Sequence, residues 1–304
     1  MESVFPQKGS WMEWWSAAQA ASRGDLAHAH VDLDGGEIRM PVYHPHRQVS
    51  SVRARSASPW KLSVEIDQPE QVMAALQGGA ESLRLRGCQD PGGWLDGVVK
   101  GFVELEFIQG PTVSELAAAK ALPESGGVLL DWWSGEDISS HLDALQKNQG
   151  GHLRAVLITD AAKQGWTLSG RLALLIRACE EAVHCLGGDL SRVSLDLCLD
   201  RDPVVALASS EALKRLLLKR WPISAWPWIK GIGDPNGLGD TSGRDNLIRL
   251  MSSSLAGALS GLDAVGAQNP MPNGGAQDLS EPEKWSRNAL HLLREESGLV
   301  HPNA

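Results

Sequence analysis

The residues best placed to bind a small anion lie in and after a glycine-rich segment, "KGIGDPNGLGDTSGRDN", which runs from Lys230 to Asn246. The segment holds five glycines and leads into a stretch with helical spacing that carries Arg244 and Arg249. Backbone N–H groups at the start of a helix, together with nearby cations, suit a phosphate group. The segment matches neither the G-x-G-x-x-G pattern nor the P-loop pattern, so a flexible loop without a ligand explains the glycines equally well.

A second set of polar residues directly follows predicted strands, where the active sites of parallel barrels lie. The residues at these positions are Asp67, Gln68, Gly87, Cys88, Gln109, Asp131, Trp132, Trp133, Asp160, Asp200, Lys230, Gln268 and Asn269. A carboxylate at the start of a loop is more often a helix cap or a turn former, and no nucleophile with a partnered base stands among these residues. An enzyme that uses Asp131, Asp160 and Lys230 for acid–base work is therefore one alternative among several.

Histidine pairs near the N-terminus raise the question of a metal site. His28 and His30 are separated by one residue, as are His44 and His46, and alternating histidines on a short strand point the same way. No acidic or thiol partner completes such a site, so we predict no metal ligands. The four cysteines form no C-x-x-C pair and predict reduced thiols rather than a disulfide framework.

These side chains need a scaffold, and from Pro59 onward short apolar or β-branched runs alternate with segments of helical spacing. The strand candidates are Lys61–Ile66, Ser82–Arg86, Phe102–Phe107, Val128–Asp131, Leu153–Ile158, Val193–Cys198, Ala225–Lys230 and Asp263–Ala267. The helix candidates that follow them are 69–77, 92–99, 112–120, 136–147, 168–186, 203–219, 242–260 and 281–297. Eight βα units in about 245 residues predict a (β/α)8 TIM barrel. A doubly wound open sheet is the alternative, although it does not require eight units.

Two elements differ in how clearly the sequence defines them. The seventh strand is the weakest, because Pro222 and Pro227 flank or interrupt it. The last helix is the clearest, with Ser280 as its N-cap, Pro282 in its first turn and Gly298 as its C-terminal stop.

The first 58 residues differ from the rest and predict an N-terminal arm. A Trp-rich helix, "SWMEWWSAAQAASRG", has an apolar face without a local partner, and an extended stretch and a Ser/Arg stretch follow it. Such a face usually packs on another domain or another chain. We therefore assign residues 1–58 to the arm and residues 59–304 to the barrel.

The composition excludes several classes of partner. The formal net charge is −9 and the isoelectric point is near 5.5, whereas nucleic-acid grooves and anionic membrane surfaces require clustered Lys and Arg. No apolar run approaches the roughly 20 residues that span a bilayer, and the N-terminus lacks the features of a signal peptide. We predict a cytoplasmic globular protein that binds neither nucleic acid nor membrane.

Three stretches read together resemble the methylmalonyl-CoA mutase family, in particular the small, or beta, subunit of its heterodimeric bacterial members. The first is "MPVYHP" followed by "PWKLSVEIDQPEQVMAALQGGAESLRLRG", the second is "RDNLIRLMSSSLAGALSGLDAV", and the third is "WSRNALHLLREESGLVHPNA". They are similar to the family's arm and opening βα unit, to its "N-x-x-R…GGADAI" helix and strand, and to its "ILREE…DPAGG" end. The resemblance covers most of residues 37–304.

The resemblance implies a barrel that holds an acyl-CoA in its central channel, together with a flavodoxin-like domain that binds adenosylcobalamin. In the family's catalytic subunits a tyrosine and a histidine face the substrate, but the matching positions here fall at about Glu65 and near Asp160. The cobalamin signature D-x-H-x-x-G is absent as well. These departures imply that the chain has no catalytic residues and binds no cofactor itself, so that adenosylcobalamin would belong to the family or to a partner chain.

We therefore predict a non-catalytic partner subunit of a cobalamin-dependent acyl-CoA mutase, an isomerase by family, and leave open whether this chain is an enzyme. It would pair through the N-terminal arm, either with a catalytic mutase subunit as a heterodimer or with itself as a homodimer. The alternative is an acyl-CoA-binding barrel that works with a cobalamin domain supplied by another chain. The residues expected to bind the substrate are Gln109, Asp160, Lys230, Arg244, Asn246 and Arg249.

Overall fold

A computed structural model describes residues 31–33, 37–39, 59–108, 116, 125–130, 145, 147, 152–157, 166–221, 226–239, 243–271 and 280–299. The chain divides into two units, Met1–Ser51 and Val52–Ala304. In the first unit, strands β1 (Val31–Leu33) and β2 (Glu37–Arg39) pair antiparallel. The predicted Trp-rich helix and the predicted boundary at residue 58 lie outside the described residues, and the arm stays a prediction.

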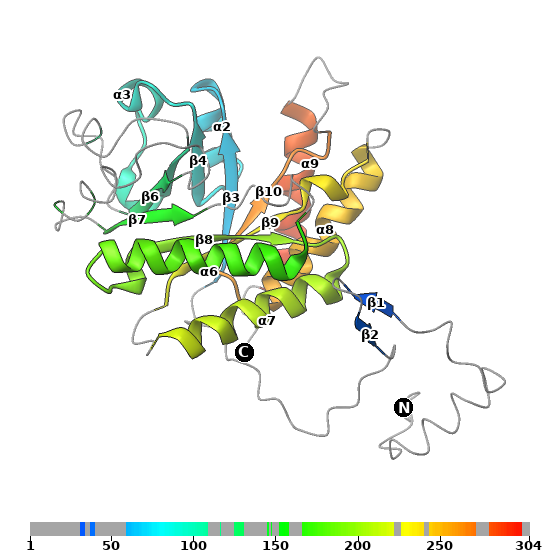
Figure 1. Ribbon diagram of the computed structural model, residues 1–304. Coiled ribbons are helices and arrows are strands. Elements are labelled where there is room, and N and C mark those ends of the chain that lie inside the picture. The colour runs from blue at the N-terminus through cyan, green and yellow to red at the C-terminus, as the bar shows by residue number, and fades with distance from the viewer. Residues whose placement is uncertain are drawn as a thin grey trace. The chain divides into compact units, whose positions relative to one another are not determined.

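Eight parallel strands of the second unit close into a barrel (Figure 1). In spatial order they are β3 (Lys61–Ile66), β4 (Ser82–Arg86), β5 (Glu104–Ile108), β6 (Ser125–Leu130), β7 (His152–Leu157), β8 (Val193–Leu199), β9 (Trp228–Gly233) and β10 (Ala264–Ala267). Strand β10 pairs with β3 and so completes the closure. This confirms the predicted (β/α)8 barrel and excludes the doubly wound open sheet. Each predicted strand overlaps an observed one.

Helices follow the strands and cover the outside of the barrel (Figure 1). Their start points follow from local sequence: Thr167 accepts a hydrogen bond from the Gly170 N–H (3.2 Å), and Asp202 accepts one from the Val204 N–H (2.9 Å). Within the described residues, no helix combines the length and the apolarity that crossing a bilayer requires. The predicted helices at 112–120 and 136–147 lie almost entirely outside the described residues. The helices and short 3₁₀ turns are α2 (Glu70–Gln77), α3 (Pro91–Trp94), η2 (Lys100–Phe102), α6 (Leu168–Cys185), η4 (Leu190–Arg192), α7 (Pro203–Arg220), η5 (Pro235–Gly237), α8 (Gly243–Leu259) and α9 (Ser280–His291).

The hydrophobic core contains alternate residues of the strands together with the apolar faces of the helices. On the helices, Val72, Leu175, Leu213 and Leu217 are buried in this core. Burial of each such side chain contributes about 1.5–3 kcal/mol. The residues between these core positions must point into the barrel, because successive side chains of a strand point to opposite faces. The core strand residues include Leu62, Val64, Leu83, Leu85, Leu105, Phe107, Leu195 and Leu197.

Strand β9 lies further along the chain than predicted. The sequence predicted a strand that ends at Lys230, but the observed strand continues to Gly233. A glycine inside a strand usually marks a close approach of another group. A Cβ atom on Gly231 would come within 2.6 Å of Leu199 and 2.8 Å of Leu262. The first four residues of the supposed glycine-rich loop are therefore strand, and glycine permits the tight packing there.

The last helix keeps its predicted place but changes its winding. Helix α9 continues as a π-helical turn, η6 (Leu292–Glu296), where the sequence predicted one continuous α-helix. Gly298 follows with φ 71°, which confirms it as the C-terminal stop. The indole N–H of Trp60 then donates a hydrogen bond to the carbonyl of Leu299 (2.8 Å). The end of the last βα unit is thus attached next to the start of β3.

Candidate functional site

Charged and polar side chains occupy the inward-facing positions of the barrel strands. In "KLSVEI", "SLRLR", "ELEFI" and "SLDLCL" they alternate with the core leucines, valines and phenylalanine. The strand register places Arg84 between Glu65 and Glu106, and Asp196 beside Lys230. Bulky apolar side chains usually fill the interior of such a barrel, so this charged interior is unusual.

Four of these side chains form a buried ionic group, which we call the inner cluster: Arg84, Glu106, Asp196 and Lys230. Each is at most 6% exposed. Lys230 Nζ donates a hydrogen bond to Glu106 Oε2 and lies 3.8 Å from Asp196 Oδ1. Arg84 Nη2 donates to Asp196 Oδ2, and Arg84 Nε lies 3.4 Å from Glu106 Oε2. Every charge in the cluster thus has an opposite charge next to it.

Burial and pairing together set the protonation of the inner cluster. Burial would raise the pKa of Glu106, but the charges of Lys230 and Arg84 outweigh it and lower that pKa. The pKa of Asp196 is raised, mainly by burial and further by the negative charge of Glu106. The positive charges of Arg84 and Lys230 lower this pKa, but they do not outweigh the rise. Burial and the charge of Arg84 lower the pKa of Lys230. Although burial opposes its charge, the neighbouring carboxylates raise the pKa of Arg84, so the guanidinium stays charged.

Glu65 and Arg86 extend this ionic network to the carboxyl end of the barrel. Arg84 Nη1 lies 3.9 Å from Glu65 Oε2, and Arg86 Nε donates to Glu65 Oε1 at 2.6 Å. The Glu65 side chain is 40% exposed. Burial would raise the pKa of Glu65, but the hydrogen bond from Arg86 and the charges of Arg84 and Arg86 lower it. Glu65 therefore presents an ionised carboxylate at the mouth of the barrel.

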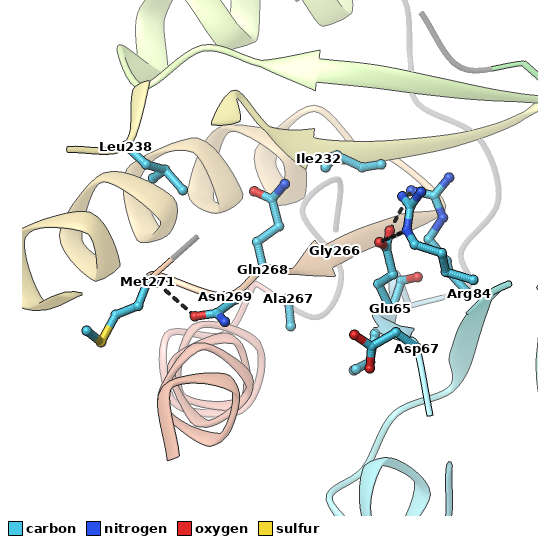
Figure 2. Close-up of a pocket in the computed structure, with 13 residues that line it drawn as sticks. Glu65, Asp67, Arg84, Ile232, Leu238, Gly266, Ala267, Gln268, Asn269 and Met271 are labelled. Atoms are coloured by element: carbon cyan, nitrogen blue, oxygen red, sulfur yellow. Dashed lines mark hydrogen bonds and ion pairs between the residues drawn. The ribbon is translucent and has the colours of Figure 1, made fainter. Parts of the chain in front are cut away.

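A pocket of about 430 Å³ opens at this end, where β3, β4, β9 and β10 finish (Figure 2). Gly233 helps to shape it, because a Cβ atom there would lie 2.6 Å from the side-chain oxygen of Gln268. Figure 2 shows Glu65, Asp67 and Gln268 with the apolar side chains of Ile232, Leu238 and Met271 around the same space. The polar lining residues are Ser63, Glu65, Asp67, Arg84, Arg86, Gln268 and Asn269, and the remaining ones are Val64, Ile232, Leu238, Gly266, Ala267 and Met271.

A second polar layer lies at the opposite end, where the strands begin. Glu104 accepts hydrogen bonds from Lys61 (3.0 Å) and Arg154 (2.6 Å). Both cations also lie over the ring of Trp228, 5.4 Å and 4.6 Å from its centroid. Cation–π contacts of this kind add to ion pairing. These side chains lie at the amino end of the barrel, opposite the pocket.

Three of the four cysteines, Cys88, Cys179 and Cys198, do not supply an activated nucleophile. All four are free. Burial raises the pKa of Cys88 to about 11 and the pKa values of Cys179 and Cys198 to about 12. These three thiols stay protonated at neutral pH, and a protonated thiol is a poor nucleophile.

The structure separates the residues that the sequence grouped around the glycine-rich segment. Lys230 is fully buried inside the barrel, whereas Arg244 is exposed near the start of α8. Arg249 Nη1 donates to Asn246 Oδ1 at 2.9 Å. None of these four residues lines the pocket. Their roles in ligand binding stay predictions.

Asn246 has a structural role that its sequence context did not reveal. Its side chain bonds to both the N–H and the carbonyl of Gly239 (2.7 Å each) and donates to the carbonyl of Pro270 (2.8 Å). It therefore holds together the loops that follow β9 and β10.

Several other predicted residues cannot be placed in this site. Gln109, Asp131 and Asp160 lie outside the described residues, as do the four N-terminal histidines. Within the part of the chain that the structure describes, no three His, Cys, Asp or Glu side chains gather in a way that could hold a metal ion.

Sequence reasoning missed Arg84, Glu106 and Asp196, and it considered Glu65 only as the position of an absent tyrosine. The available signal was the period-two alternation of polar and apolar residues in the predicted strands. In a closed barrel with helices outside, the polar set must face inward. Applied to "SLRLR", "ELEFI" and "SLDLCL", this rule would have identified all three residues.

Comparisons with known proteins give only distant structural likenesses. No family model matches the chain, and the search of curated proteins found no match. A dihydropteroate synthase from Yersinia pestis with a pterine–sulfa conjugate has 13% identity and a TM-score of 0.48, covering 82% of this chain and 99% of that one. The enzyme from Coxiella burnetii with pteroic acid has 11% identity and a TM-score of 0.46, covering 88% and 98%. These likenesses are too distant to assign a reaction or a ligand to this chain.

The comparisons contradict the resemblance to methylmalonyl-CoA mutases, because the similar solved structures are dihydropteroate synthases. The predictions of a non-catalytic mutase subunit and of an acyl-CoA-binding barrel are therefore wrong, and so is the isomerase class that they implied. The catalytic mutase subunit and adenosylcobalamin lose their basis as partner and cofactor. The expectations that this chain binds no cofactor itself, and that it forms a homodimer through the arm, stay predictions.

The motifs that suggested the mutase family have packing roles in this barrel. Arg294 of "LREE" pairs with Glu81 of "GAESL", and His291 bonds to the carbonyl of Gly78 (2.8 Å). The N-x-x-R pattern corresponds to Asn246 and Arg249, whose side chains are hydrogen-bonded to each other. The contacts of Arg294 and His291 join the last helix to the first βα turn and so help to close the barrel.

Proposed function

We propose that the chain binds a small organic molecule in the pocket at the carboxyl end of its barrel. The pocket itself carries the proposal: it encloses about 430 Å³ at the ends of four strands. Active sites of (β/α)8 enzymes lie at this end, and ligand pockets enclose roughly 300–1,000 Å³. The pocket thus has both the position and the size of a small-molecule site.

The lining supports the same proposal. Ile232, Leu238 and Met271 provide an apolar surface, while Glu65 and Gln268 provide polar groups that could orient a ligand. A few polar groups against an apolar wall are typical of small-molecule sites. The inner cluster also fixes the position of Arg84, which lines the pocket, because the buried carboxylates of Glu106 and Asp196 contact its guanidinium. A ligand would therefore meet a preorganised site.

The proposal can be tested by blocking the pocket at Gly266. A Cβ atom on this inward-facing residue would meet only Gly231 O at 3.5 Å and Ile232 Cγ1 at 3.7 Å, which are ordinary contacts. Gly266→Ala should therefore preserve the pocket, whereas the longer side chain of Gly266→Leu should fill it.

A library of small organic fragments would be screened by ligand-observed NMR against the wild type and both variants, with circular dichroism to confirm folding. We expect fragments that bind the wild type and Gly266→Ala but not Gly266→Leu. An absence of binding fragments, or binding that Gly266→Leu leaves unchanged, would refute the proposal.

The cytoplasmic location expected from the sequence remains part of this proposal. Four free thiols are in keeping with a reducing compartment. Microscopy of the tagged protein in its native host would test it, and exclusive recovery from outside the cytoplasm would contradict it.

A further inference from the structure

The basic side chains that line the pocket are already paired with carboxylates of the protein. Arg84 contacts Asp196 directly and also lies 3.4 Å from Glu106 and 3.9 Å from Glu65. Arg86 donates to Glu65 at 2.6 Å. An anionic ligand would have to compete with these carboxylates for the arginines. The cations of the pocket therefore offer little attraction to an anion.

Two acceptor groups in the pocket lack a donor among the residues that the structure describes. The side-chain oxygen of Gln268 is buried and accepts no hydrogen bond. Asp67 donates through its backbone N–H to Gln71 (3.3 Å), and its residue is exposed to solvent at the mouth of the pocket, with no described residue donating to its carboxylate. By contrast, the side-chain oxygen of Asn269 accepts from the Met271 N–H (2.8 Å). A carboxylate accepts hydrogen bonds in any orientation, so Asp67 can accept from a donor whichever way a ligand approaches.

These acceptors come from adjacent strand ends. Strands β3 and β10 are neighbours, and their register pairs Val64 with Ala267. One residue further along each strand stand Glu65 and Gln268, and Asp67 follows at the end of β3. Figure 2 shows these side chains with Ile232 and Leu238 on the same pocket. A flat ligand could therefore place donors on the acceptors and a ring on the apolar wall.

We infer that the pocket selects a small molecule with an apolar body and a donor-rich nitrogen group, such as an amine or an amidine, rather than a carboxylate or a phosphate. The inference rests on the proposed function, small-molecule binding in this pocket. A donor placed at Gln268 would satisfy a buried acceptor that is costly to leave unpaired. A charged donor at Asp67 would add a charge-assisted hydrogen bond, which is stronger than a neutral one.

A pair of matched probes can test this selectivity. Benzamidine and benzoate share a planar, ring-bearing shape, but the first offers N–H donors and a positive charge, whereas the second offers acceptors and a negative charge. Calorimetric titration of the full chain should show benzamidine binding at least about tenfold more tightly than benzoate. The Asp67→Asn variant, which keeps the side-chain shape, should weaken benzamidine binding by about tenfold.

The control variant is Asp96→Asn, which removes one negative charge from an exposed position outside the pocket lining. It should leave benzamidine binding unchanged. Benzoate that binds as tightly as benzamidine, or an unchanged affinity in Asp67→Asn, would overturn the inference while leaving the proposed function intact. The inference also fails if other fragments bind in the pocket but benzamidine does not. An empty fragment screen would instead reject the proposed function.

Discussion

At the scale of single residues, the most consequential feature is the ammonium group of Lys230 inside the barrel. A charged group without water costs several kcal/mol unless an opposite charge and hydrogen bonds compensate. Glu106 accepts a hydrogen bond from Lys230, and Asp196 lies 3.8 Å away. The stability of the barrel should therefore depend on keeping both sides of the pair.

Removal of both partners together should be less harmful than the two single removals would predict by addition. Glu106→Gln or Lys230→Met should each lower the free energy of unfolding by about 3–5 kcal/mol, because a buried charge loses its partner. The double variant should cost clearly less than the sum of the two. Urea unfolding followed by tryptophan fluorescence measures all three. Additive losses would show that the pair is not coupled.

The contribution of Glu106 to the free energy of unfolding should decrease as the pH falls. Its pKa is lowered in the folded chain from an ordinary value of 4.5, so its stabilising contribution is present above that value and is lost as the pH falls below it. Glu65 acts in the same direction, whereas Asp196, with its raised pKa, acts in the opposite one.

The free-energy difference between the wild type and Glu106→Gln should therefore shrink as the pH falls below 4.5. Urea unfolding at a series of pH values gives this difference. A difference that grows under acid would contradict the assignment, and Asp96→Asn serves as the control for a change in net charge.

At the scale of elements, the sequence predicted the eight βα units but not what the strands enclose. The bounds of β3 and β4 agree to the residue, because Lys61–Ile66 and Ser82–Arg86 alternate sharply between polar and apolar residues. The predicted bounds of β9 were wrong. Gly231 lies in this strand because it packs closely against Leu199, a residue that is distant in the sequence. Long-range contacts of this kind leave little local signal.

Close packing at β9 gives a prediction at this scale. Gly231→Ala should destabilise the chain by about 1–3 kcal/mol, because the added methyl group would overlap Leu199 and Leu262. Gly266→Ala is the matched control, since its nearest neighbours are 3.5 Å and 3.7 Å away and it should change stability by less than about 0.5 kcal/mol. Thermal and urea unfolding would compare the two. Equal stability of both variants would mean that β9 does not need its glycine.

At the scale of the whole molecule, sequence patterns predicted the architecture but misidentified the family. Eight repeats of one unit are a strong signal for a closed barrel. The motifs that suggested a mutase were short, and Glu81, Asn246, Arg249 and Arg294 turned out to serve packing between neighbouring elements. The pocket, by contrast, is assembled from β3, β4, β9 and β10, and its composition becomes visible only when these ends are brought together.

The closed barrel should not need the N-terminal arm in order to fold. A closed barrel has no exposed strand edge, so residues 59–304 should keep the cooperative unfolding of the full chain. If the arm joins two copies, the full chain should have twice the mass of its own monomer in light scattering, and the shortened chain should be a monomer. An aggregated or unfolded shortened chain would contradict the division, and identical oligomeric states would contradict the arm-mediated homodimer.

We propose, in short, that a donor-bearing small molecule binds at the carboxyl end of this barrel. A crystal structure of the full chain soaked with benzamidine tests it most directly. We expect electron density in the pocket between β3 and β10, with an amidine nitrogen within hydrogen-bond distance of the Asp67 carboxylate. An empty pocket at saturating probe concentration, or benzamidine bound only elsewhere on the molecule, would contradict it.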